Sequence, residues 1–191
     1  MARIAMIADD MFEDVELRQP YDQLREAGHE VVLVGLEAGK QITGKKGKER
    51  FTIERAASDV RADEFDALVI PGGYSPDKLR TSLPMVAFTR AFFDQGKLVA
   101  AVCHAPSLLI EADVTEGRTL TSWPSIRTDL LNAGARWVDR EVVEDGNLLT
   151  SRNPGDLPAF ADAILRRLRE GTSAGRPARE ASDVSPDAQA H

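Results

Sequence analysis

Short apolar segments alternate along the chain with segments of helical periodicity, and this alternation limits the possible folds more than any other feature. The clearest strand segments, rich in Val, Leu, Ile and Ala, are residues 3–8, 29–35, 65–70 and 97–102. Strands buried on both faces of a parallel sheet have this nearly continuous apolar composition. Because helices separate the strands, we predict an α/β domain with a mostly parallel sheet and helices on both faces.

The remaining elements follow from periodicity and turn residues. Helices are predicted over residues 13–27, 84–95, 105–112, 126–133 and 157–170. In the first helix we expect Val15, Leu24 and Ala27 in the core, and we expect Pro20 to bend or divide the helix. Hairpins are predicted over residues 41–53, with an exposed GKKG turn, and over residues 141–151.

Composition indicates a soluble protein of one domain. The chain has 191 residues, of which 42% are hydrophobic and 29% charged. We predict a single domain over residues 1–170 and a flexible tail over residues 171–191, where large aliphatic residues become rare. A net charge of −7 argues against nucleic-acid and membrane partners. Because no export signal is evident and a lone cysteine fits a reducing compartment, we expect a cytoplasmic location.

The predicted sheet indicates where a ligand would bind. In open parallel sheets, ligands bind beyond the carboxyl ends of the strands. This rule selects the loops at residues 9–13, 71–77 and 103–106. The three loops lie side by side if the strands that precede them are neighbours in the sheet.

Cys103, the only cysteine, follows a predicted buried strand and precedes a predicted helix. A nucleophile occupies this position in a strand–elbow–helix arrangement, which needs small neighbours such as Ala101 and Ala105. The start of the helix should favour the thiolate and lower the pKa of the cysteine. The alternative is that Cys103 is a small apolar residue of the core.

His104 is the best candidate for a base beside Cys103. The other two histidines begin a strand, at His29, and end the chain, at His191. Gly72 and Gly73 let the backbone approach a substrate closely, and their N–H groups with that of His104 could form an oxyanion hole.

Glu13 has two interpretations. Acidic residues in a first helical turn favour the helix dipole, and Asp14 and Glu16 share this property. Alternatively, Glu13 lies over Cys103 as a desolvated, protonated carboxyl group that donates to the sulfur or relays protons. Spacing does not decide between these interpretations.

Other kinds of site are disfavoured. One cysteine and scattered histidines form no metal-ligand cluster, and no glycine-rich nucleotide loop is present, so we expect no metal and no cofactor. The basic residues Lys45, Lys46, Lys48 and Arg50 are expected to form a solvated hairpin tip rather than a nucleic-acid site.

Several motifs follow one another along the chain: FEDVEL, FDALVIPGG, AVCHAPSLLI, TSWPSI, NAGARWVD and SRNPGDLPAF. Together they resemble the PfpI-like intracellular cysteine peptidases of the ThiJ/PfpI superfamily. The resemblance implies a flavodoxin-like three-layer α/β/α sandwich related to class I glutamine amidotransferases. It also implies that Cys103 is the nucleophile, that His104 is its partner, and that Glu13 is the buried glutamate near the sulfur.

The resemblance further implies a homo-oligomer in which an acid from the adjacent subunit completes a Cys-His-acid triad. Here that acid is Asp77, where the family's peptidases have glutamate, and Ala105 replaces the usual glycine. The implied function is that of a stress-related cysteine hydrolase, either a peptidase or a deglycase or glyoxalase acting on a small carbonyl substrate. Two alternatives are a redox-responsive stress protein whose Cys103 is oxidised, and an inactive member whose site has decayed.

Overall fold

The computed structural model describes residues 1–171, so the predicted tail lies outside the described residues except for Gly171. Within this part, a seven-stranded sheet has the order β10-β11-β7-β6-β1-β2-β5. All neighbouring strands are parallel except the β10–β11 pair. The strands are β1 (Arg3–Ile7), β2 (Glu30–Gly35), β5 (Arg55–Ala56), β6 (Ala67–Ile70), β7 (Leu98–Val102), β10 (Val143–Asp145) and β11 (Leu148–Ser151).

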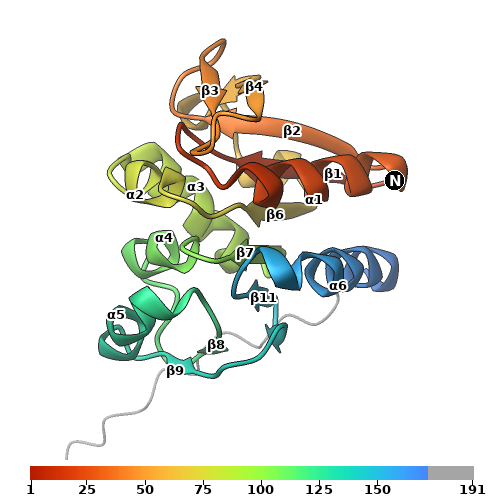
Figure 1. The fold of residues 1–191 in the computed structure, drawn as a ribbon. Coiled ribbons are helices and arrows are strands. Elements are labelled where there is room, and N and C mark those ends of the chain that lie inside the picture. The colour runs from red at the N-terminus through yellow and green to blue at the C-terminus, as the bar shows by residue number, and fades with distance from the viewer. Residues whose placement is uncertain (172–191) are drawn as a thin grey trace, which may run out of the picture.

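Helices cover both faces of this sheet (Figure 1). The helices are α1 (Asp14–Glu26), α2 (Ser75–Leu79), α3 (Leu83–Asp94), α4 (Pro106–Glu111), α5 (Arg127–Asn132) and α6 (Leu157–Glu170). Short 3₁₀ turns are η1 (Ala57–Asp59), η2 (Ala62–Glu64), η3 (Pro124–Ile126) and η4 (Pro154–Asp156). Helices α1 and α6 pack on one face of the sheet, and α3 and α4 pack on the other.

The alternation of side chains along β1 shows how one strand contributes to two cores. Ile4 and Met6 belong to the apolar cluster beneath α1 and α6, whereas Ala5 and Ile7 belong to the cluster beneath α3 and α4. All four side chains are fully buried. Because successive residues of a strand point to opposite faces, one apolar segment fills both layers. The predicted three-layer α/β/α sandwich is confirmed.

Smaller elements complete the fold. Strands β3 (Gln41–Thr43) and β4 (Arg50–Thr52) form the first predicted hairpin, and β10 and β11 form the second. Strands β8 (Thr119–Leu120) and β9 (Arg136–Trp137) form a separate parallel pair. No helix within residues 1–171 is long and apolar enough to cross a membrane.

The structure corrects two expectations about α1. Pro20 does not divide the helix, which runs without interruption through this residue, and Pro20 is buried. Leu24 is buried as expected, but Val15 and Ala27 are exposed. The buried face of α1 begins instead with two acidic residues, Asp14 and Glu16, and this polar start points to the functional site.

Candidate active site

The three loops selected from the sequence meet at one edge of the sheet. Strands β7, β6 and β1 are neighbours, so their carboxyl ends lead side by side into Cys103, Gly72 and Asp9. The loops also contact one another, because the N–H group of Glu13 donates to the carbonyl oxygen of Gly72 at 3.2 Å. Phe12 forms an isolated β-bridge with Gly73. The predicted place of the site therefore agrees with the topology.

Cys103 occupies a strained elbow between β7 and α4. Its φ angle is +64°, in the left-handed region that costs a residue with a Cβ about 1–2 kcal/mol. Hydrogen bonds hold this conformation: the N–H group of Cys103 donates to the carbonyl of Ser151 at 3.0 Å, and the N–H group of Trp123 donates to the carbonyl of Cys103 at 2.9 Å. The residue is 6% exposed. The chain thus spends stability on presenting this side chain in one direction.

Four groups surround the sulfur. Nδ1 of His104 lies 3.2 Å from Sγ. The backbone N–H groups of Gly73 and His104 act on the sulfur to lower the pKa of the thiol, whereas the neighbouring carboxyl group of Glu16 raises it. N–H groups in this position favour a thiolate.

Glu16, which the sequence did not single out, is the carboxyl group at the sulfur. Its side chain is fully buried, and its Oε2 atom accepts a hydrogen bond from the N–H group of Gly72 at 2.9 Å. A Cβ atom at Gly72 would lie 2.5 Å from Oε2 of Glu16 and 2.6 Å from Cβ of Cys103. Position 72 must therefore be glycine for the carboxyl and the thiol to approach each other. The N–H group of Gly72, expected in the oxyanion hole, is instead bonded to Glu16.

The thiol and this carboxyl form a coupled acidic pair. Burial, and then the charge of Glu13, raise the pKa of Glu16 to about 7. Burial, and then the charge of Glu16, raise the pKa of Cys103 to about 12, although the N–H groups of Gly73 and His104 work to lower it. The sequence predicts a lowered pKa for Cys103. This prediction is wrong when Glu16 is ionised, because the negative charge of Glu16 raises the pKa of the thiol. Because two adjacent buried groups cannot both ionise, the pair keeps one proton near neutral pH.

Glu13 lies in the same loop but has other partners. Its carboxylate is paired with the ammonium groups of Lys45 at 2.6 Å and Lys46 at 2.7 Å. Burial would raise the pKa of Glu13, but hydrogen bonds from Lys45 and Lys46 outweigh it and lower the pKa. The structure therefore places an ionised carboxylate at Glu13, and the protonated carboxyl group expected there is that of Glu16.

His104 lies between the sulfur and a group of polar and aromatic side chains. Its Nε2 atom is 3.1 Å from Oγ of Ser125. The rings of Tyr74 and Trp123 each lie 6.3 Å from the imidazole, centroid to centroid. Burial, and then the charge of Lys45, lower the pKa of His104. A neutral imidazole beside the thiol is suited to accept and return a proton.

Asp77 lies on α2 and is exposed. Within the chain, the hydroxyl of Ser125 occupies the place at His104 where a triad would have its acid. The contribution of Asp77 to the His104 of a neighbouring subunit remains a prediction.

The site contains functional candidates that sequence reasoning missed. They are Glu16, Tyr74, Trp123, Ser125 and Lys45. Two of them, Trp123 and Ser125, lie in the TSWPSI motif, which was noted but given no role. The signal for Glu16 was its position on the α1 face that also carries Leu17 and Leu24, both fully buried. Lys45 lies at an exposed hairpin tip, as expected, and it is also paired with the buried carboxylate of Glu13, a contact that the sequence did not predict.

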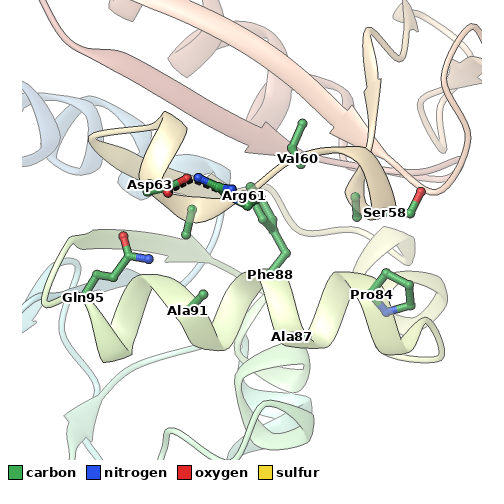
Figure 2. Close-up of a pocket in the computed structure, with 11 residues that line it drawn as sticks. Ser58, Val60, Arg61, Asp63, Pro84, Ala87, Phe88, Ala91 and Gln95 are labelled. Atoms are coloured by element: carbon green, nitrogen blue, oxygen red, sulfur yellow. Dashed lines mark hydrogen bonds and ion pairs between the residues drawn. The ribbon is translucent and has the colours of Figure 1, made fainter.

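Two further features lie outside this cluster. A groove of about 480 Å³ runs between α3 and residues 57–63 (Figure 2), and the predicted site residues do not line it. Among residues 1–171, no group of three or more His, Cys, Asp or Glu side chains could hold a metal ion.

Comparison with known proteins identifies the family. Residues 2–167 match the DJ-1/PfpI family. This chain belongs to the DJ-1/PfpI family. It is 50% identical over 167 residues to protein/nucleic acid deglycase 2 of Escherichia coli, covering 87% of this chain and 97% of the relative. It is 46% identical over 169 residues to general stress protein 18 of Bacillus subtilis, covering 88% and 98%.

A solved structure supports the same assignment. The two-domain protein of Anabaena variabilis with DJ-1/ThiJ/PfpI-like and ferritin-like domains has a TM-score of 0.87 and 42% identity to this chain. The match covers 95% of this chain, which spans 52% of that longer protein. The predicted family resemblance and the predicted class of protein, a stress-related cysteine hydrolase of the PfpI type, are confirmed by these relatives.

Proposed function

We propose that this member of the family uses Cys103 as the nucleophile of a deglycase, removing carbonyl adducts from amino or thiol groups. The observation that carries the proposal is the convergence on one sulfur of an imidazole, two backbone N–H groups and a buried carboxyl group. A core cysteine needs none of these partners and would not occupy a backbone conformation at φ +64°.

The proton of the Cys103–Glu16 pair determines the first step. When that proton is on Glu16, the sulfur is a thiolate that accepts hydrogen bonds from the carboxyl O–H and from the N–H groups of Gly73 and His104. The thiolate adds to the carbonyl carbon of the substrate, and the electron pair of the C=O bond moves to the oxygen. The same two N–H groups lie next to that oxygen and stabilise its charge.

His104 then transfers protons between the substrate and the solvent. In a 2-oxoaldehyde adduct the amine or thiol is bound to a carbinol carbon beside the keto group, and the aldehyde C=O that Cys103 attacks forms when this group leaves. The Nδ1 atom of His104, 3.2 Å from the sulfur, is placed to move the proton of the carbinol hydroxyl to the departing group.

After Cys103 has added to the aldehyde carbon, His104 moves the proton on that carbon to the neighbouring keto carbon through an enediol, and a 2-hydroxyacyl thioester results. A water molecule then attacks the thioester carbon. His104 takes a proton from this water, and the sulfur leaves with its electron pair and again shares the proton of Glu16. In this scheme Asp77 of an adjacent subunit orients the imidazole.

The names of the relatives suggest the substrate. One relative, which the match covers over 97% of its length, is named protein/nucleic acid deglycase 2. We therefore propose adducts of 2-oxoaldehydes, such as methylglyoxal, as the substrate class. Tyr74 and Trp123 are 59% and 41% exposed beside His104. Their rings offer apolar walls for the carbon skeleton of such an adduct.

The test uses three variants, one of them a control. Cys103→Ala should reduce the release of amine from a methylglyoxal adduct of N-acetyl-lysine to the uncatalysed rate. His104→Ala should lower kcat by roughly 10²–10⁴-fold, whereas His29→Ala, a histidine that accepts a hydrogen bond from the N–H group of Ala2, should leave kcat unchanged. Full activity in Cys103→Ala would reject the proposal.

A second candidate is favoured by the Glu16 contact. A protonated carboxyl at a thiolate also stabilises an oxidised sulfur, as in a redox-responsive protein. In that reaction the thiolate attacks peroxide, forms an S–O bond and releases water after protonation. Intact-mass measurement after mild peroxide treatment separates the two. Oxygen adducts on Cys103 without turnover of any adduct favour the redox-responsive protein, and turnover with an inert sulfur favours the hydrolase.

A further inference from the structure

The tip of the β3–β4 hairpin brings two positive charges to the edge of the thiol site. The ammonium group of Lys45 lies 2.6 Å from one carboxylate oxygen of Glu13, and that of Lys46 lies 2.7 Å from the other. The Glu13 side chain is 4% exposed, so the ammonium groups of the hairpin tip are paired with a buried carboxylate. A tip expected in solvent is therefore part of the site.

The charges of this cluster balance only while the thiol pair keeps its negative charge. Glu13 provides one negative charge for the two ammonium groups, and the Cys103–Glu16 pair with its single proton provides the other. When the sulfur bonds to carbon and Glu16 keeps the proton, the pair becomes neutral and one ammonium group is left without a counter-charge. A partly buried charge of this kind attracts an anion more strongly than a charge in open water does.

Lys45 and Lys46 differ in what else they face. Nζ of Lys45 lies 5.8 Å from the ring centroid of Tyr74, one of the aromatic residues beside His104. The charge of Lys45 also influences the pKa values of Glu16 and His104, whereas Lys46 influences that of Glu13. The Lys45 side chain is 32% exposed and that of Lys46 is 52% exposed. Lys45 thus faces the reactive groups, and Lys46 lies farther out.

The backbone holds Lys45 in this place. Its N–H group donates to the carbonyl of Phe12 at 2.8 Å. The carboxylate of Asp14 accepts hydrogen bonds from the N–H groups of Lys46, Lys48 and Glu49, each at 2.9 Å. Because the tip is fixed at four points to the start of α1, the ammonium group of Lys45 is positioned before any ligand arrives.

We propose that Lys45 is a specificity-determining residue that binds the carboxylate of an anionic substrate while Cys103 attacks the neighbouring carbonyl or other electrophilic carbon. The inference extends the proposed function by naming a substrate class, adducts that carry a carboxylate close to the reacting carbon. As the sulfur loses its negative charge to the new bond, Lys45 binds this group while Glu13 keeps its pairing with Lys46.

A pair of alkylating reagents tests this without any turnover. Iodoacetate and iodoacetamide have nearly the same size, both lose iodide to the Cys103 thiolate, and only iodoacetate carries a carboxylate. The measured quantity is the ratio of their second-order rate constants, followed by intact mass. Any change in the ionised fraction of the thiol affects both reagents equally and cancels in the ratio.

We expect Lys45→Met to lower the iodoacetate-to-iodoacetamide ratio by about fivefold to tenfold, because one charge is lost near the sulfur. Lys45→Arg should restore the ratio. The matched control Lys46→Met, which removes a charge from the same carboxylate, should change it less than about twofold. An unchanged ratio in Lys45→Met, or an equal loss in Lys46→Met, would overturn the proposal.

A kinetic arm separates this inference from the proposed function. Its substrates are the methylglyoxal hemithioacetals of N-acetylcysteine, which is anionic, and of N-acetylcysteine amide, which is neutral. Lys45→Met should lower kcat/KM for the anionic adduct relative to that for the neutral adduct, because any effect of the lost charge on the pKa values of Glu16 and His104 is shared by both adducts. If the wild-type protein converts neither adduct while the alkylation ratio behaves as expected, the deglycase proposal fails and the carboxylate site at Lys45 stands.

Discussion

At the scale of single residues, Glu16 is the group whose behaviour depends most on its surroundings. Burial raises the pKa of its carboxyl group from the usual 4.5 to about 7. Between pH 4.5 and about pH 7, Glu16 is therefore mostly protonated in the folded protein and mostly ionised in the unfolded chain. Stability conferred by this proton is complete below pH 4.5 and is lost as the pH rises through about 7.

Glu16→Gln should remove this pH dependence. Between pH 5 and pH 8, the unfolding free energy of the wild type should fall by about 2–3 kcal/mol relative to that of the variant. Urea unfolding of both proteins at the two pH values measures the difference, in which the contributions of groups that do not interact with Glu16 cancel. Asp63→Asn is the control, because the hydrogen bond from Arg61 lowers the pKa of Asp63, and its carboxylate stays ionised over this range. Parallel curves for the wild type and Glu16→Gln would contradict the burial argument.

The sequence could predict the sulfur but not its carboxyl partner. Cys103 is the only cysteine, and an apolar strand leads directly to it, so its position could be read from the chain. Three acids in the FEDVE stretch were chemically equivalent candidates. Which acid faces the sulfur depends on the rotation of α1 about its axis. The spacing of apolar residues predicts that the face with Val15 is buried. In the structure the buried face begins with Asp14 and Glu16 instead, so the predicted rotation is wrong.

At the scale of elements, the β3–β4 hairpin depends on α1 as much as on its own strands. Asp14 is 1% exposed, and a Cβ atom at Gly44 would lie 2.4 Å from its carboxylate. Burial would raise the pKa of Asp14, but the N–H groups of the hairpin outweigh it and lower the pKa. The acid at the start of α1 therefore serves as the anchor of the hairpin tip.

Asp14→Ala should release this tip. Loss of three charge-assisted hydrogen bonds should lower the unfolding free energy by about 2–4 kcal/mol. The amides of Lys46, Lys48 and Glu49 should exchange with deuterium faster, because the carboxylate no longer accepts from them. Mass spectrometry of the hairpin peptide measures the exchange.

The matched control for this experiment is Asp22→Ala. Asp22 lies on the same helix, and its ion pair with Arg18 is half-exposed, so its loss should change stability by less than about 0.5 kcal/mol. Unaltered exchange in Asp14→Ala would mean that the two strands hold the tip without help from α1.

The regular elements could be predicted to within a few residues, whereas short and irregular ones could not. Strand β7 follows from an unbroken apolar run, and α6 follows from core spacing that begins at Leu157. Helix α2 was missed because its sequence, SPDKL, begins with the residues that also start turns. Its five residues are too few to show helical periodicity.

At the scale of the whole molecule, the sheet order gathers residues from distant parts of the chain. Strand β1 lies beside β6, and β6 lies beside β7, so residues near positions 13, 73 and 103 share one edge (Figure 1). From the sequence this adjacency could be stated only as a condition of the site, and the observed sheet order meets that condition. The packing of one subunit on another has no such periodic signal, so the origin of the triad acid could be proposed only through the family resemblance.

The proposed contribution of Asp77 across subunits predicts that two inactive variants restore each other. A Cys103→Ala chain keeps Asp77 but has no nucleophile, and an Asp77→Ala chain keeps Cys103 but lacks the acid. Coexpression in equal amounts gives mixed oligomers in which the acid of the first chain can reach His104 of the second. For randomly paired dimers, half are mixed and each has one complete site of two, so roughly a quarter of wild-type activity should return.

This experiment also distinguishes the two possible geometries. If Asp77 served the His104 of its own chain, no mixed oligomer would contain a complete site, and the mixture would only average its two parents. The exposed position of Asp77 on α2, together with the hydroxyl of Ser125 at Nε2 of His104, favours the arrangement across subunits. Recovery of activity must therefore be accompanied by a stable oligomer in size-exclusion chromatography, and recovery in a monomeric fraction would contradict the prediction.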